Sequence, residues 1–80
     1  MKLRHIGSNQ AILETSKAEI LFSYDTPVAI RIYGPDHKIL RTDEYFSRTT
    51  SRHINSWLNG RKAEVCPQPY IESFLRERGD

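Results

Sequence analysis

The spacing of apolar residues changes near residue 47, and this change constrains the fold more than any other feature of the sequence. Before it, apolar and polar residues alternate, which is typical of half-buried β-strands. The clearest alternating segments run from Ala18 to Tyr24 and from Val28 to Tyr33. After it, apolar residues recur at the i, i+3, i+4 spacing of an amphipathic helix. The chain is therefore predicted to be an α+β protein whose strands precede its helices.

Short turns separate the expected strands. Asp25-Thr26-Pro27 and Gly34-Pro35-Asp36 are turn sequences, and both are too short for the crossover that parallel neighbours need. We therefore expect an antiparallel β-meander of five or six short strands. The expected strand segments are residues 3–6, 10–15, 18–24, 28–33, 37–42 and 63–66.

Two short helices are expected in the second half of the chain. Hydroxyl side chains cap helix starts, so we expect Thr49 or Thr50 to be the N-cap of a helix over Thr50–Asn59. Gly60 is suited to the left-handed conformation that ends helices. A second helix is expected to start near Pro69, because proline is tolerated in a first turn.

One hydrophobic core is expected, with the first helix packed on one face of the sheet. The 80 residues make a single domain over residues 1–80, and 38% of them are hydrophobic, which suffices for one core. The residues expected in that core are Ile20, Phe22, Val28, Ile30, Ile32, Ile54, Trp57, Leu58, Ile71 and Phe74.

No constellation of residues predicts catalysis, a cofactor or a metal. The three histidines and Cys66 are widely separated and have no recognised ligand spacing. The glycines form no phosphate-binding loop. Cys66 lies in an apolar strand, where a free cysteine usually packs as a small hydrophobic residue. We therefore expect a protein that is not an enzyme and has no cofactor.

The N-terminal residues and the lengths of the apolar runs indicate the cellular location of the protein. Lys2 and Arg4 are not followed by an apolar stretch, so we expect no signal peptide. No apolar run approaches the roughly 20 residues that span a membrane. The single cysteine gives no intramolecular disulfide. A cytoplasmic location and no membrane partner are therefore expected.

Basic residues are unevenly distributed along the chain. The segment from His37 to Lys62 holds six lysines and arginines against two acidic residues, a net +4. The remainder holds six against eight, a net −2, which together give the formal +2 of the chain. Such a basic segment favours an acidic partner.

The basic segment contains the candidate site, a nucleic-acid-binding helix face. Arginine and asparagine match guanine and adenine edges, and amides at a helix start can hold a phosphate. The candidate residues are Arg48, Thr50, Ser51, Arg52, Asn55, Arg61 and Lys62. The alternative, which the sequence leaves open, is that the same residues are only the solvated face of an amphipathic helix.

Four tyrosines are further candidates, because aromatic rings stack on unpaired bases. The alternative is core packing with the hydroxyl group at the rim, which is favoured above all for Tyr24 and Tyr70. His53 is expected at the edge of the first helix, hydrogen-bonded near Trp57.

Two stretches of the sequence resemble a known group of proteins. Residues 21–29 read LFSYDTPVA, and residues 46–58 read FSRTTSRHINSWL. With Thr42 to Phe46 between them, they resemble a family of small uncharacterised proteins of phages, prophages and other mobile elements. The resemblance runs from Leu21 to Gly60. It carries over no site residue, because the family is one of unknown function.

The resemblance and the basic segment lead to two functional hypotheses. The first is a small accessory protein of phage or mobile-element type that binds nucleic acid in the cytoplasm of the host cell. The alternative is a protein-interaction module or inhibitor that acts on a host protein or defence complex. A homodimer through an exposed sheet edge is a further hypothesis, because short meanders leave unpaired edges.

Overall fold

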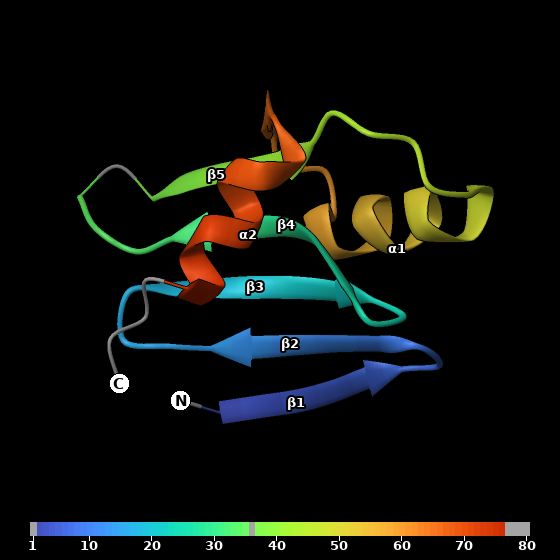
Figure 1. Cartoon of the computed structure of the whole chain (residues 1–80), viewed down its shortest axis with the longest axis horizontal. Coiled ribbons are helices and arrows are strands. Elements are labelled where there is room, and N and C mark those ends of the chain that lie inside the picture. Colours follow the sequence, from blue (N-terminus) through green and yellow to red (C-terminus); the bar gives the residue numbers. More distant parts are fainter. Residues whose placement is uncertain (1, 36, 77–80) are drawn as a thin grey trace.

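A computed structural model describes residues 2–35 and 37–76 of the chain. Six strands form one sheet in the order of the sequence, and two helices pack against it (Figure 1). The strands are β1 (Lys2–Gly7), β2 (Gln10–Glu14), β3 (Ala18–Ser23), β4 (Thr26–Ile32), β5 (Lys38–Thr42) and β6 (Glu64–Cys66). The helices are α1 (Arg48–Leu58) and α2 (Gln68–Arg76).

The α+β class is confirmed, but the sheet is not wholly antiparallel. Strands β1 to β5 pair antiparallel with their neighbours, as predicted from the short turns. Strand β6 pairs parallel with β5. The reason is that residues 43–63, which include α1, form a crossover between these two strands. A crossover of this length returns the chain to the end of the sheet from which β5 started.

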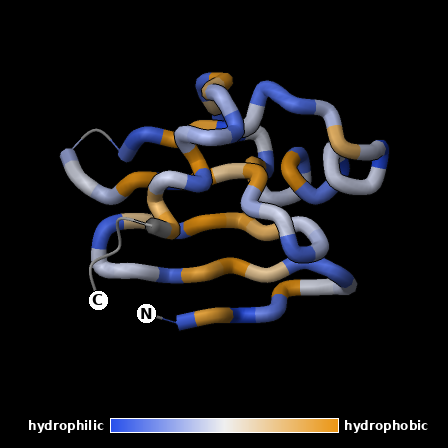
Figure 2. Tube along the Cα trace, in the orientation of Figure 1, coloured by the Kyte–Doolittle hydropathy of each residue, from blue (hydrophilic) through white to orange (hydrophobic). Residues whose placement is uncertain are grey.

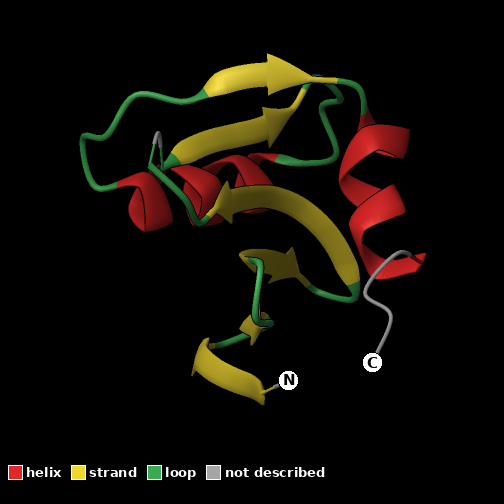
Figure 3. Ribbon diagram, turned by 90° about the vertical axis from the view of Figure 1, so that its left-hand side faces the viewer, coloured by secondary structure: helices red, strands yellow, loops and turns green. Residues whose placement is uncertain are grey.

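The two helices lie on opposite faces of the sheet (Figure 3). The prediction that α1 packs on one face is confirmed, but α2 packs on the other, and there are two cores instead of the one expected. On the α1 face, Leu21 and Ala29 are fully buried beneath the helix. On the α2 face, Ile20 and Ile30 are buried to the same degree. The cluster beneath α1 is one core, and the residues on the opposite face form a second core beneath α2. The central strands are therefore apolar on both faces.

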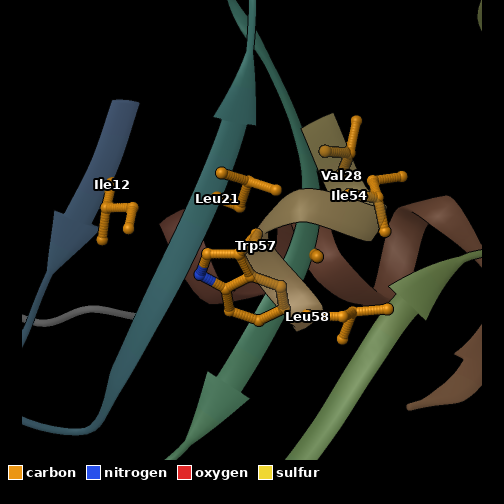
Figure 4. Packing of buried hydrophobic residues seen from close by; sticks show 7 residues of the cluster. Ile12, Leu21, Val28, Ile54, Trp57 and Leu58 are labelled. Carbon is orange, nitrogen blue, oxygen red and sulfur yellow. The ribbon is translucent and has the colours of Figure 1, made fainter. Parts of the chain in front are cut away.

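A β-bulge decides which core receives Val28. Leu21 pairs with Ala29, but the next residue, Phe22, pairs with Pro27, so Val28 is the extra residue in β4. A bulge interrupts the alternation of side chains. Val28 accordingly packs in the α1 cluster beside Ala29 rather than beside Ile30. In Figure 4 the α1 side chains Ile54, Trp57 and Leu58 lie over Leu21 and Val28.

The expected core residues are thus divided between two clusters. Val28, Ile54, Trp57 and Leu58 belong to the α1 cluster. The remaining expected core residues belong to the α2 cluster, where Phe22, Ile32 and Phe74 are only partly buried; these are Ile20, Phe22, Ile30, Ile32, Ile71 and Phe74. Figure 2 shows the hydrophobic residues concentrated along the strands.

Helix α1 begins earlier than predicted. Its N-cap is Ser47, not Thr49 or Thr50, and the Ser47 hydroxyl oxygen accepts a hydrogen bond of 3.1 Å from the backbone N–H of Thr50. The predicted end is confirmed: Asn59 has φ 51°, and Gly60 follows with φ 85°. The earlier start brings Arg48 into the first turn.

Helix α2 starts at Gln68, one residue before the predicted start. The Gln68 side-chain amide donates a hydrogen bond of 2.7 Å to the carbonyl oxygen of Pro27, which fastens α2 to β4. Ile71 is fully buried. Neither described helix has the length and apolar character required to cross a membrane.

The packing predicts that Trp57→Ala will cost about 3–5 kcal/mol, because it leaves a cavity in the α1 core. Trp57 is only 9% exposed, and the whole stability of so small a chain is of the same order. Urea unfolding followed by circular dichroism measures the loss. Val65→Ala is the control, because Val65 is 64% exposed and should change stability by less than about 0.5 kcal/mol. Equal midpoints for the two variants would mean that α1 is not docked through Trp57.

Candidate functional site

The exposed side of α1 carries a straight row of polar side chains. Arg48, Arg52, Asn55 and Asn59 are exposed and follow one another at i, i+4, i+7 and i+11. At 100° per residue these positions share one narrow stripe, about 16 Å long, opposite the side that packs on the sheet. We call these four residues the α1 stripe.

The positive charge of the stripe is not neutralised. Helix α1 contains no acidic residue. Within residues 2–35 and 37–76, neither Arg48 nor Arg52 has an ion pair, whereas Arg4 and Arg31 both pair with glutamates. A cation in a first turn is opposed by the helix dipole, and like charges at i, i+4 repel each other. The two arginines thus concentrate positive potential at a cost to the helix.

Thr50 lies outside this surface, and the backbone amides of Thr50 and Ser51 are used within the helix. Thr50 is buried, and its hydroxyl oxygen lies 2.9 Å from the hydroxyl oxygen of Ser23. Its backbone N–H is used by the Ser47 cap, and the N–H of Ser51 donates to the carbonyl oxygen of Ser47 at 3.0 Å. Both amides are therefore occupied by the helix itself and do not face a phosphate.

Arg61 and Lys62 are also separated from the stripe. The Arg61 guanidinium lies over the Trp57 ring at 5.1 Å and donates to the carbonyl oxygens of Trp57 and Leu58 at 2.8 and 3.0 Å. It therefore caps the last turn of α1. Lys62 lines a shallow groove with Lys38 at the β5–β6 end of the sheet. Of the predicted site, the structure brings together only Arg48, Arg52 and Asn55.

A chain of buried polar side chains fastens α1 to the sheet. The hydroxyl of Ser47 donates to Thr50 Oγ1 at 3.2 Å, Thr50 Oγ1 lies 2.9 Å from Ser23 Oγ, and Ser23 Oγ lies 2.7 Å from Nδ1 of His53. A chain in which each hydroxyl donates to the next satisfies every group. Ser23 and His53 are 30 residues apart, so no local pattern pointed to them.

His53 is therefore a buried anchor and not the helix-edge partner of Trp57 that was expected. Its ring centroid lies 5.9 Å from that of Tyr24. A serine hydroxyl in short contact with a histidine can act as a nucleophile, but Ser23 is 2% exposed and its hydroxyl does not reach the surface. This Ser–His pair positions α1 and presents no surface nucleophile.

Cys66 is buried, as the sequence predicts. Burial, and secondarily the carboxylate of Asp43, raises the pKa of the Cys66 thiol above its ordinary value. The part of the chain that the structure describes contains no group of three or more histidine, cysteine or acidic side chains placed to hold a metal ion.

The tyrosines are more exposed than expected. Tyr24 and Tyr70, for which core packing was favoured, are 50% and 47% exposed. Tyr24 rests against His53, and Tyr70 packs edge-on against Phe74. Tyr45, in the loop before α1, is 74% exposed.

A second surface lies on the α2 face, where α2 leaves β1 and β2 uncovered (Figure 1). A groove of about 580 Å³ runs there beside Leu3, which is 55% exposed. We call it the apolar groove. It is lined by Leu3, His5, Asn9, Gln10, Ala11, Leu13, Phe22, Tyr24 and Asp25.

The chain matches the model of a protein family. The model of a family of unknown function (DUF8033) matches residues 1–73. This match begins before and ends after the segment from Leu21 to Gly60 in which the resemblance was recognised, and it includes most of α2. No curated protein and no solved structure matches the chain.

The polar chain predicts that Ser23→Ala will destabilise the protein by about 1–3 kcal/mol, because Nδ1 of the buried His53 loses its partner and the buried Thr50 hydroxyl keeps only its contact with Ser47. Thermal unfolding measures this loss. The matched control is Ser56→Ala on the exposed side of α1, which should be nearly neutral. A Ser23→Ala protein as stable as the control would show that the chain contributes nothing to docking.

The raised pKa of Cys66 predicts slow alkylation of the folded protein. A higher pKa leaves less thiolate, which is the reactive form, at neutral pH. Labelling with iodoacetamide, followed by mass spectrometry across a pH series, should show the rise in rate at a higher pH in native buffer than in urea. Coinciding pH profiles would contradict the raised pKa, whatever the absolute rates.

Proposed function

The chain belongs to the family of unknown function whose model it matches, and we propose that this protein is a non-enzymatic accessory domain that binds nucleic acid through the α1 stripe. Membership of the family does not by itself assign an activity. The observation that carries this proposal is the unneutralised pair Arg48 and Arg52 on the exposed side of α1. The helix dipole and the repulsion between the two arginines both disfavour these charges, and no acidic residue of α1 offsets them. A polyanionic partner would supply the missing negative charge.

The neighbouring groups support the same partner. Asn55 continues the stripe with an amide that both donates and accepts, and arginine and asparagine are the side chains that pair with guanine and adenine edges. Arg48 and Arg52 are about 6 Å apart along the helix axis, so both contact the same short stretch of backbone phosphates. Binding of this kind depends strongly on salt.

The proposal extends to the type of protein. The resemblance of residues 46–58 to small proteins of phages and mobile elements supports an accessory role of that type. A binding role rather than catalysis is supported by Ser23 and Cys66, whose nucleophilic atoms are buried. The pKa of Cys66 is shifted upwards, away from the thiolate form that reacts.

A second candidate is a protein-interaction module or inhibitor that acts on a host protein or defence complex. The apolar groove favours it, because a partly exposed Leu3 beside Leu13 and Phe22 offers an apolar surface at the sheet edge. This role predicts a protein partner that binds in stoichiometric amounts and stays bound after nuclease treatment. Leu3→Asp should abolish this binding, and Arg52→Glu should retain it. Sedimentation of the same variants would reveal a homodimer through this surface.

The nucleic-acid proposal predicts that Arg52→Glu will weaken binding and reduce the slope of log affinity against log salt by about 1, because a phosphate contact is lost. Fluorescence anisotropy with labelled DNA and RNA at several salt concentrations measures both. The control is Lys17→Glu, which makes the same change in net charge at the other end of the sheet, where the carbonyl oxygen of Lys17 accepts a hydrogen bond from Tyr33. If the two folded variants bind equally, the α1 stripe is not the binding surface.

A further inference from the structure

Two aromatic side chains precede α1 and are exposed. Tyr45 is 74% exposed and Phe46 is 41% exposed, in the loop between β5 and α1. Tyr45 is the most exposed large hydrophobic side chain among the described residues. Leaving two aromatic rings in water gives up the free energy that their burial would contribute, so their exposure calls for a reason.

Among the described residues, neither ring pairs with another ring or with an arginine. Phe46 occupies the N′ position before the Ser47 cap, where an apolar residue often packs on the N4 residue of the helix. Here N4 is Ser51, whose polar side chain offers no apolar surface for such a contact. In the described part of the chain, the rings of Tyr24, Tyr33 and Tyr70 each meet another ring or an arginine, but those of Tyr45 and Phe46 do not.

The loop is nevertheless held in place at both ends. The backbone N–H of Asp43 donates to the carbonyl oxygen of Cys66 at 2.9 Å, and that of Glu44 donates to the Thr42 hydroxyl oxygen at 3.1 Å. At its other end the loop enters the Ser47 cap. The Ser47 hydroxyl oxygen accepts a hydrogen bond from the backbone N–H of Thr50 at 3.1 Å, so the chain is fixed on both sides of Tyr45 and Phe46.

The arrangement therefore combines open aromatic faces with cations. Arg48 follows Phe46 after a single residue, and Arg52 lies one turn further along the same side of α1. Aromatic rings beside basic side chains bind single strands, because every unpaired base offers a face for stacking while its phosphates meet the cations. A duplex keeps its bases stacked on one another and offers only its phosphates and groove edges to such a surface.

We infer that Tyr45 and Phe46 stack the unpaired bases of a single-stranded nucleic acid, while Arg48 and Arg52 contact its phosphates. This inference rests on the proposed function and adds the class of nucleic acid. Single-stranded DNA and single-stranded RNA share the chemistry of base faces and phosphates, and the two are separate arms of the test.

The test compares three labelled ligands by fluorescence anisotropy: a single strand, the duplex of the same sequence, and a single strand of abasic sites of equal length. The abasic strand carries the phosphates without the bases. Tyr45→Ala should weaken binding of the base-containing strand by about 5- to 150-fold, as expected for the loss of one stacked base. The same variant should leave the affinities for the duplex and the abasic strand unchanged.

Two control variants test whether the effect depends on an aromatic ring and on its position at residue 45. Tyr45→Phe retains the aromatic face and should retain single-strand binding. Tyr33→Ala removes another exposed tyrosine, whose ring lies under Arg31 beyond the opposite end of β5 from Tyr45. This variant should have no effect on binding. Circular dichroism confirms that each variant is folded, and Tyr45 is exposed enough for its truncation to leave the core intact.

The outcomes separate the two proposals. If Arg52→Glu weakens binding while Tyr45→Ala binds every ligand like wild type, stacking is overturned and the proposed function stands. If wild type binds the duplex as tightly as the single strand, the single-strand inference is also overturned. If wild type binds none of the ligands at low salt, the proposed function fails and the inference fails with it.

Discussion

Burial of the central strands on both faces is the constraint on which the rest of this structure depends. Leu21 and Ala29 on one face, and Ile20 and Ile30 on the other, are almost completely removed from solvent. A sheet with two apolar faces needs cover on both sides, and residues 2–35 and 37–76 supply two short helices to provide it. Each helix must therefore take one face, and neither can be lost without exposing half of the core.

The division of the helices also fixes the direction of the last strand. Because α1 covers its face as the connection between β5 and β6, the chain makes a crossover, and β6 adds to the sheet in parallel. The short β6 then leads directly to α2 on the other face (Figure 3). One arrangement of helices thus explains the single departure of the described sheet from an antiparallel meander.

The rotation of α1 about its own axis decides which residues meet solvent. Ile54, Trp57 and Leu58 set it through packing, and the buried chain from Ser47 through Thr50 and Ser23 to His53 sets it through hydrogen bonds. Apolar packing tolerates small rotations, whereas hydrogen bonds among buried groups do not. The α1 stripe is exposed as a consequence, and it lies on the opposite side of the sheet from the apolar groove.

The strands, the spacing of the α1 core residues and the end of that helix at Asn59-Gly60 were determined by the sequence alone, because each depends on neighbours within a few residues. The exposed Arg48, Arg52 and Asn55 were also predictable, since they lie opposite the apolar positions of one helix. Only the tertiary structure decided that a bulge turns Val28 toward α1, that Thr50 bonds Ser23 and that Arg61 folds over Trp57. These outcomes depend on strand register and on contacts between distant parts of the chain. No local pattern encodes them, because their free energy exists only once the sheet and the helices have come together.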